Sequence, residues 1–241
     1  MNKYYKKKMN LAVDDSHIID ENSPFAIKEA YKALYTNVRY LNIESKCKKI
    51  VVTSAVSGEG KTTLSVNLAI TMAQNLVDKR ILLIDADMRC PRVAATLGLN
   101  AKTRGLSEYL AGIDVNPNFE YIADHKLMVL PSGGPNVNPT KLIGSERMRA
   151  LLEACEQEFD YVIIDTPPVT IVTDALLFNS TVNGYIIATR SEYSNINKLS
   201  ECVSALEQVG AEIFGIVVSD MRMKKDNGKY SAYSHYGSNS R

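Results

Sequence analysis

The segment that most constrains the fold is SGEGKTT, residues 57–63, because it stands between an apolar run and a helical pattern. The run before it, KIVVTSA (49–55), has the β-branched residues of a strand, and TLSVNLAITMAQ after it has helical periodicity. Glycines let a backbone curl until successive N–H groups point at phosphate oxygens, and the N-terminus of the next helix adds its positive dipole end. Strand, loop and helix in this order predict a phosphate-binding loop of the Walker A type, with Ala55 in the place of its usual first glycine. A chance glycine-rich turn is the alternative, and the flanking strand and helix argue against it.

The residues of this loop have different expected tasks. Lys61 should reach the β- and γ-phosphates of a nucleotide, and the hydroxyl of Thr62 should bind Mg²⁺. The ligand that we expect is therefore ATP with Mg²⁺. The residues predicted to contact it form the loop and the start of the helix: Ser57, Gly58, Glu59, Gly60, Lys61, Thr62 and Thr63.

Three acidic residues follow two further apolar runs. RILLIDAD (80–87) contains Asp85 and Asp87, and DYVIIDT (160–166) contains Asp165. In an open α/β sheet the ligand lies beyond the carboxyl ends of the strands, which is where these acids fall. One such acid alone is often only a helix cap or a turn residue, whereas three of them beside a phosphate loop indicate a site.

Phosphoryl transfer divides the expected roles among these side chains, because it needs positioning and charge compensation around Mg²⁺. We expect the magnesium shell to consist of Thr62, Asp87 and Asp165, partly through water, because Mg²⁺ keeps several of its waters. Asp85 is the candidate to orient an attacking hydroxyl or to accept its proton. The predicted catalytic residues are therefore Lys61, Asp85 and Asp87.

The rest of the chain alternates between apolar runs and helical segments. Strands are predicted at 49–55, 80–87, 126–132, 160–166, 184–190 and 213–219. Helices are expected at 24–41 and near 61–77, 145–158, 172–180 and 195–209. Strands that are apolar on both faces and separated by helices predict an α/β fold with a doubly wound, mostly parallel sheet.

Composition divides the chain into three parts. Residues 1–24 are polar and are predicted to be a flexible N-terminal arm, and residues 25–221 should form the nucleotide-binding domain. Residues 222–241 have little apolar content besides tyrosines and are predicted to be a flexible tail. Three tail tyrosines at a spacing of three have no core to pack into: Tyr230, Tyr233 and Tyr236. They are either an inert aromatic tail or a cluster of phosphoacceptors, and the ATP site upstream favours phosphoacceptors.

Charge, cysteines and hydropathy exclude several classes of protein. With 28 basic and 27 acidic side chains the net charge is +1, so the chain lacks the excess positive charge that nucleic-acid binding needs. The four cysteines lie far apart, without the spacing of a zinc site or a disulfide framework, and we expect small buried thiols. No apolar run approaches the roughly 20 residues needed to cross a bilayer. We therefore expect a cytoplasmic protein whose membrane contact comes through a partner.

Several motifs together produce a family resemblance. SGEGKTT, ILLIDADMRCPR and VIIDTPP are similar to the Walker A, second acidic and Walker B motifs of the bacterial tyrosine kinases of capsule and exopolysaccharide systems. The proline-rich LPSGGPNVNPTKLI, the VTDA stretch and the tail tyrosines match as well, so the resemblance runs from about Pro24 to the C-terminus. The chain resembles the stand-alone form of this family found in Gram-positive bacteria. The fold that this implies is a P-loop NTPase fold of the ParA/MinD-like kind.

The resemblance also implies an activity and partners. The activity is ATP-dependent phosphorylation of the C-terminal tyrosine cluster by a neighbouring subunit of a ring-shaped homo-oligomer. The implied partners are the cytoplasmic segment of a separate membrane protein, an activator or polysaccharide co-polymerase, and a phosphotyrosine phosphatase; nucleic acid is not among them. The implied role is the control of capsular or exopolysaccharide synthesis and export, at the inner face of the plasma membrane.

Three places depart from the family pattern. In the loop, Ser57 stands where the family has a proline before Gly-x-Gly-Lys, a change that is tolerated because the backbone does the binding. The N-terminal helix has Glu29, Lys32 and Tyr35 where the family has a Glu-x-x-Arg-x-x-Arg pattern for oligomerisation. Lysine lacks the planar bidentate geometry of arginine and tyrosine has no charge, so the usual ring contact is altered. The last predicted strand ends in Ser219 and Asp220, where the family has an asparagine that contacts adenine.

Two other functions share parts of this pattern. A switch ATPase of the kind that partitions chromosomes or positions division sites has a similar phosphate loop and paired acids. Such ATPases carry a second lysine near the start of the loop, where this chain has Val56, and nothing in that class accounts for a tyrosine tail. The third candidate is a non-catalytic scaffold that binds nucleotide to organise polysaccharide assembly, and the intact Lys61, Thr62 and acidic residues argue against it.

Overall fold

One sheet organises the molecule. The computed structural model describes residues 18–41, 43–100, 104–135 and 138–220. Within these residues the sheet has seven strands, in the order β3-β4-β2-β5-β1-β6-β7. The strands are β1 (Lys48–Ser54), β2 (Ile81–Asp85), β3 (Glu120–Ile122), β4 (Leu127–Leu130), β5 (Tyr161–Asp165), β6 (Gly184–Arg190) and β7 (Ile213–Ser219). All neighbouring strands pair in parallel except β3, which runs antiparallel to β4.

The apolar runs predicted six of these strands and missed one. The predictions correspond to β1, β2, β4, β5, β6 and β7, within a few residues at each end. Strand β3 was not predicted because it has only 3 residues, of which none is fully buried, and it lies at the edge of the sheet. Its pairing with β4, rather than an apolar run of its own, makes it a strand.

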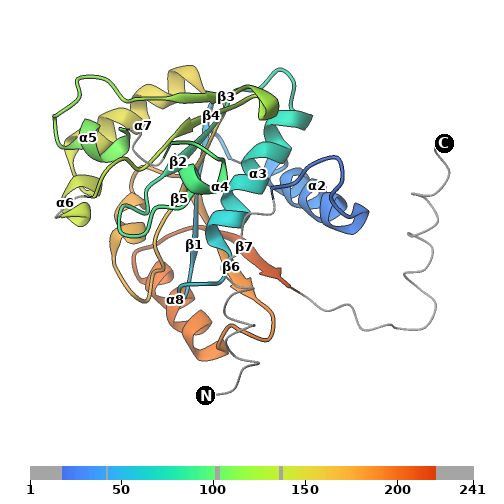
Figure 1. The fold of residues 1–241 in the computed structure, drawn as a ribbon. Helices are drawn as coiled ribbons and strands as arrows, with labels where there is room; N and C mark the ends of the chain where they lie inside the picture. Colours follow the sequence, from blue (N-terminus) through green and yellow to red (C-terminus); the bar gives the residue numbers. More distant parts are fainter. Residues whose placement is uncertain (1–17, 42, 101–103, 136–137, 221–241) are drawn as a thin grey trace, which may run out of the picture.

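Helices lie on both faces of the sheet (Figure 1). Four predicted helices are confirmed as α2 (Phe25–Arg39), α3 (Lys61–Asn75), α7 (Glu146–Glu158) and α8 (Ile196–Gln208). The helix expected at 172–180 is instead a short 3₁₀ helix, η2 (Asp174–Phe178). Four elements too short to show a helical period were not predicted: α4 (Val93–Thr96), α5 (Leu106–Leu110), η1 (Ala123–His125) and α6 (Pro139–Ile143). None of the helices in the described ranges is long and apolar enough to span a bilayer.

The core consists of two apolar clusters, one on each face of the sheet. Side chains alternate along β1, so that Val51 packs in the cluster with α7 and α8, whereas Ile50 and Val52 pack in the cluster with α3. Strands β2 and β5 are buried along their whole length. Because a strand covered on both faces buries every side chain, these strands appear in the sequence as continuous apolar runs.

The segment before α2 contacts the domain at Ile19. This residue is buried, and its N–H donates a hydrogen bond to Asn67 Oδ1 at 2.8 Å. It belongs to the predicted N-terminal arm of residues 1–24, of which residues 1–17 lie outside the described part of the chain. The contact joins the end of this arm to α3.

In α2, the two side chains that differ from the family pattern have partners within this chain. Lys32 Nζ lies 2.8 Å from Glu29 Oε1, and both side chains are exposed, so the pair adds little to stability. Tyr35 is half-buried against the core cluster that contains α3.

Three of the four cysteines are buried, as expected, and one is not. Burial raises the thiol pKa of Cys47 to about 11 and those of Cys155 and Cys202 to about 12, so these thiols stay protonated. Cys90 is exposed, which corrects the expectation of four buried thiols. The reason is local, because Cys90 lies in the turn that follows β2 rather than in a strand or helix of the core.

Candidate nucleotide-binding site

The predicted phosphate loop joins β1 to α3 at the carboxyl edge of the sheet. Residues 57–60 form the loop, and residues 61–63 open the first turn of α3. Gly58 and Gly60 have φ angles of 85° and 83°, in the left-handed region that favours glycine. Because Gly60 stands at the N-cap position of α3, it offers no side chain to the first amides of the helix, which is the arrangement of an anion-binding N-terminus.

Lys61 forms a buried ion pair with Asp87. Its Nζ lies 2.7 Å from Asp87 Oδ2, and the two side chains are 11% and 3% exposed. Burial alone lowers the pKa of Lys61, but the charges of Asp165 and Asp87 outweigh this effect and raise the pKa above its ordinary value. Lys61 is therefore a permanent cation at the place where the sequence predicts a phosphate.

Asp165 ends β5 and contacts two hydroxyl groups of α3. Its Oδ2 accepts a hydrogen bond from Thr62 Oγ1 at 2.7 Å, and its Oδ1 accepts one from Ser65 Oγ at 3.1 Å. Ser65 was not predicted, although it lies one helical turn after Thr62 and so faces the same side. Burial raises the pKa of Asp165, Lys61 opposes the rise, and the charge of Asp87 adds to it.

Asp85 ends β2, directly beside Asp165 on the neighbouring strand β5. It is fully buried; its Oδ1 accepts a hydrogen bond from the Asp87 N–H and its Oδ2 accepts one from the Val93 N–H, both at 3.1 Å. Burial and the charge of Asp165 raise the pKa of Asp85 well above its ordinary value. A carboxyl group with a raised pKa is suited to accept a proton, and this one also orients the turn that carries Asp87.

The strand order brings the predicted catalytic and metal-binding side chains to one point. Strands β2, β5 and β1 are neighbours, so Asp85, Asp165 and the loop after β1 meet at the same edge. No group of three His, Cys, Asp or Glu side chains among the described residues makes a metal site by itself. The oxygen donors of Thr62, Asp87 and Asp165 nevertheless fit Mg²⁺, which takes few protein ligands and completes its shell with phosphate oxygens and water. Outside the described residues lie the predicted phosphoacceptors Tyr230, Tyr233 and Tyr236.

Arg89, two residues after Asp87, is tied to η2. Its Nε and Nη2 donate to the two carboxylate oxygens of Asp174 at 2.7 and 3.1 Å, and Nη2 also donates to Thr140 Oγ1 at 2.8 Å. The Asp174 side chain is 1% exposed. This bidentate pair fastens the turn that carries Asp87 to η2 and α6. Asp174 lies in the VTDA stretch of the family resemblance, for which the sequence indicated no role.

The outer side of the phosphate loop contacts the turn between β6 and α8, which the sequence did not predict. The Tyr193 hydroxyl donates to the carbonyl of Ser57 at 3.0 Å, and the Ser194 hydroxyl donates to the Glu59 carboxylate. The partners are 136 and 135 positions apart in the chain, so no local pattern could have joined them.

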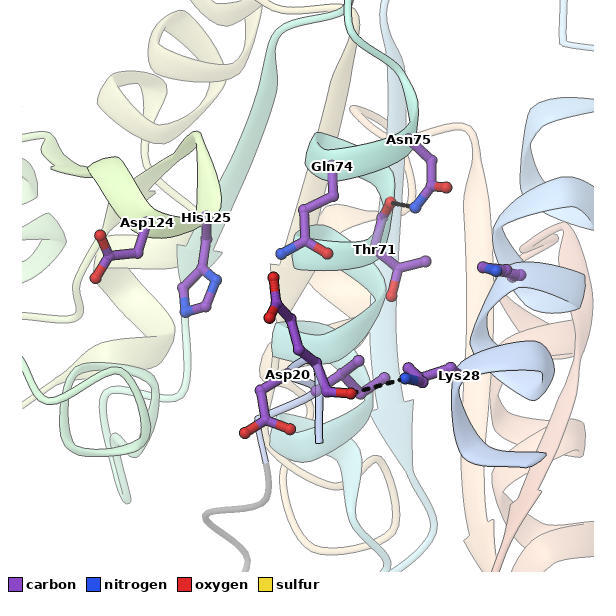
Figure 2. A pocket seen from close by; sticks show the side chains of 10 residues that line it. Asp20, Lys28, Thr71, Gln74, Asn75, Asp124 and His125 are labelled. Atoms are coloured by element: carbon purple, nitrogen blue, oxygen red, sulfur yellow. Dashed lines mark hydrogen bonds between the residues drawn. The ribbon is translucent and has the colours of Figure 1, made fainter. Parts of the chain in front are cut away.

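A second polar region lies further along α3 (Figure 2). There, a cavity of about 490 Å³ is lined by Ile19, Asp20, Glu21, Lys28, Lys32, Thr71, Gln74, Asn75, Asp124 and His125. His125 has a buried Nδ1 atom, and neither this atom nor the buried Thr71 Oγ1 has a hydrogen-bond partner among the described residues. Thr71 lies ten residues after Lys61, about 15 Å along the helix, so this cavity is separate from the predicted site.

The loop, the lysine and the acids at adjacent strand ends define a P-loop nucleotide-binding domain. Residues 47–214 match the AAA domain family. The chain is 33% identical to the tyrosine-protein kinase CpsD of Streptococcus agalactiae, over 89% of this chain and 91% of that protein. The kinase domain of the Escherichia coli tyrosine kinase ETK superposes with a TM-score of 0.74 at 29% identity, covering 95% of this chain and 92% of that domain. The chain belongs to the bacterial tyrosine-protein kinase family.

A more distant likeness concerns the fold alone. A plasmid partition protein from Borrelia burgdorferi superposes with a TM-score of 0.54 at 22% identity, covering 80% of this chain and 87% of that protein. The doubly wound P-loop fold predicted from the sequence is thus confirmed. The likeness also explains why the sequence pattern left a switch ATPase as an alternative.

Proposed function

We propose that this chain is an ATP-dependent protein-tyrosine kinase that phosphorylates the tyrosine cluster in the tail (residues 230–236) of a neighbouring copy. The observation that carries the proposal is the Lys61–Asp87 ion pair beside the Thr62–Asp165 hydrogen bond, at the sheet edge where the phosphate loop ends. The names of its relatives, which are tyrosine-protein kinases, support the activity.

The binding step uses the loop and the residues around it. The loop amides and Lys61 bind the β- and γ-phosphates of ATP, which the left-handed glycines and the helix N-terminus favour. Thr62, Asp87 and Asp165 would hold Mg²⁺, which neutralises charge on the transferred phosphate when bound. The low exposure of Lys61 and Asp87 keeps water away from these charges and strengthens their electrostatic effect.

In the transfer step, the acceptor tyrosine oxygen attacks the γ-phosphorus and the bond from that phosphorus to ADP breaks. The hydroxyl proton of the tyrosine passes to Asp85, whose raised pKa suits a proton acceptor. ADP then leaves the loop. The tail carries the phosphate, which adds close to two negative charges for each modified ring.

Regulation follows from this charge. Crowded phosphates on the tail are repelled by the acidic residues of the site, so docking of a modified tail on its neighbour weakens. We further infer a cytoplasmic homo-oligomer, activated by the cytoplasmic segment of a membrane protein and reversed by a phosphotyrosine phosphatase. Its role would be the control of capsular or exopolysaccharide synthesis and export.

The test is to measure phosphotyrosine on the purified protein with MgATP, with and without the cytoplasmic peptide of the activator. Mass spectrometry maps the modified sites, and Lys61→Met is the control without phosphate binding. We expect phosphate on the tail tyrosines of the natural chain and none on the control. A variant with all three tail tyrosines replaced by Phe should lose this signal; if its phosphotyrosine is unchanged, the tail is not the acceptor.

A different outcome would favour the second candidate, the switch ATPase. Hydrolysis of ATP with no phosphotyrosine under any condition would support that function, with which the fold likeness to a plasmid partition protein is compatible.

A further inference from the structure

The outer side of the phosphate loop rests on a turn that the reaction described above does not use. The turn lies between β6 and α8, and it is closed by Arg190: its N–H donates to Ser194 Oγ at 2.8 Å, and its carbonyl accepts from the Ser194 N–H at 2.9 Å. The Ser191 N–H donates to the Ser219 carbonyl at 2.9 Å, which joins the turn to the end of β7. Because both sides of the turn are hydrogen-bonded, it is a fixed support for whatever it contacts.

Tyr193 contacts the phosphate loop at the peptide bond between Ser57 and Gly58. Its hydroxyl donates to the Ser57 carbonyl at 3.0 Å. In a planar trans peptide the C=O of one residue and the N–H of the next point in opposite directions. A Ser57 carbonyl held by Tyr193 therefore turns the Gly58 N–H away from Tyr193, toward the inner side of the loop, where phosphate-binding amides must point.

The approach of Tyr193 to the loop is close. A Cβ atom added to Gly58 would lie 2.8 Å from the Tyr193 hydroxyl oxygen, and the φ of 85° at this glycine is already unfavourable for other residues. The left-handed φ disfavours a side chain at position 58, and such a side chain would also displace the Tyr193 hydroxyl from its contact with the loop. The bare backbone of Gly58 is what allows Tyr193 to reach the carbonyl beside it.

Glu59 is a buried carboxylate inside a loop that binds an anion, an unfavourable combination unless its charge is engaged elsewhere. The residue is 1% exposed. Its Oε2 accepts a hydrogen bond from the Val56 N–H at 2.8 Å, and its Oε1 accepts one from the Ser194 hydroxyl. The side chain therefore closes the loop on itself and fastens it to the turn that carries Tyr193. Only the backbone N–H of Glu59 is then available to bind phosphate.

We propose that Tyr193 and Glu59 are positioning residues, which hold the phosphate loop from its outer side in the conformation whose amides receive the nucleotide phosphates. The inference rests on the proposed nucleotide site and adds to it two side chains that touch no phosphate. Lys61 and the N-terminus of α3 stay in place when these contacts are lost. Loss of the contacts therefore weakens ATP binding and raises the KM for ATP, while kcat at saturating ATP is retained.

The first test compares two exposed tyrosines, of which only Tyr193 contacts the phosphate loop. Tyr193→Phe removes the hydroxyl and keeps the ring, and Tyr121→Phe makes the same change at an exposed position on β3. Binding of a non-hydrolysable ATP analogue with Mg²⁺ is measured by calorimetry on the full chain, beside its thermal unfolding. We expect Tyr193→Phe to weaken binding between about threefold and tenfold, the effect of one hydrogen bond, with the unfolding temperature unchanged. Equal affinities for the two variants would overturn the proposal for Tyr193.

The second test separates the hydrogen bonds of Glu59 from its volume. Glu59→Ala removes both contacts and should raise the KM for ATP the most, and Glu59→Gln keeps one carbonyl acceptor and should recover part of the loss. Equal KM values for Ala and Gln would overturn the role of Glu59, as would a loss confined to kcat.

The same experiments distinguish this inference from the proposed function. If the natural chain binds the analogue, Lys61→Met does not, and Tyr193→Phe binds like the natural chain, the nucleotide site stands and the inference falls. If the natural chain itself does not bind the analogue, both are wrong.

Discussion

Helix α3 has a polar region toward each end, and the two regions are built in opposite ways. At its N-terminus Asp87 and Asp165 are buried, the Lys61 side chain is only 11% exposed, and each of the three is within hydrogen-bond distance of a partner. Around its C-terminal half, the cavity of Figure 2 is lined by exposed charges such as those of Asp20 and Asp124. The cavity is about 490 Å³ in volume, whereas the charged groups at the N-terminus of α3 are packed against one another.

In this protein the candidate active site is therefore located by its paired, buried charges and not by the presence of a cavity. Removing a charge from water costs free energy unless the charge is paired and hydrogen-bonded. A group of paired, buried charges therefore indicates a functional site. Exposed charges cost little and contribute little. The comparison leads us to expect large effects on function from changes at the first end and small effects on stability alone from changes at the second.

The largest expected effect is a loss of nucleotide binding, caused by a substitution at the N-terminal end of α3 and not by one at the C-terminal end. Lys61→Met removes the buried cation and should weaken the binding of a MgATP analogue by a factor of about 100 or more, since it deletes a charge-assisted contact to phosphate. Lys28→Met, a lysine at the cavity, is the matched control and should bind as the natural chain does. Calorimetry measures both, and a similar loss in the two variants would place the nucleotide elsewhere.

A smaller effect, on the free energy of unfolding, is expected when ion pairs that differ in burial are broken. Arg89→Ala leaves the buried carboxylate of Asp174 with only the hydroxyl of Thr140 and should lower the free energy of unfolding by about 2 kcal/mol. Because Arg89 is 39% exposed, this is less than the loss expected for a wholly buried pair. Lys32→Ala breaks the exposed pair with Glu29 and should cost less than about 0.5 kcal/mol. Urea unfolding measures both, and equal losses would contradict the difference in burial.

The buried carboxyl group of Asp165 should make the stability of the protein depend on pH. The pKa of Asp165 is raised in the folded protein, so its ionised form is disfavoured there, and folding is weakened as the pH rises from the unfolded pKa, near 3.8, through the folded one. Asp165→Asn lacks this charge and should be more stable than the natural chain at pH 7. The gain should shrink as the pH falls toward 4. Urea unfolding across pH tests this; a gain that does not change with pH would rule out titration as the cause, and kinase activity should be lost throughout.

At the cavity we expect a small gain in stability and no effect on function. The hydroxyl of Thr71 is buried and has no hydrogen-bond partner in the part of the chain that the structure describes. Thr71→Val has nearly the same shape and removes that hydroxyl, so it should raise the free energy of unfolding by about 0.5–1 kcal/mol. Chemical denaturation provides the measurement. Destabilisation would mean that the hydroxyl is bound by a group in the cavity, and that the second end of α3 is also a site.

Local pattern was enough to predict most of the elements and the separate pieces of the site. The loop at 57–63 depends on glycines, a lysine and the helix that follows, all within a few residues. The acids Asp85, Asp87 and Asp165 were found because each stands at the end of an apolar run, or just after it, and such runs are typical of covered strands. Short elements such as α4 and β3 were not predicted, because three or four residues are too few to show the hydrophobic period of a helix or a strand.

The sequence by itself therefore determined which side chains can form the site and which class of fold carries them. Only the tertiary structure decided which groups meet. Thr62 and Asp165 are 103 positions apart, Arg89 and Asp174 are 85 apart, and Tyr193 is 136 from Ser57. Periodicity and motifs report neighbours along the chain, whereas these contacts depend on the order β2-β5-β1-β6 and on the turns at the strand ends. Strand order is set by packing over the whole sheet, and no short segment of the chain contains it.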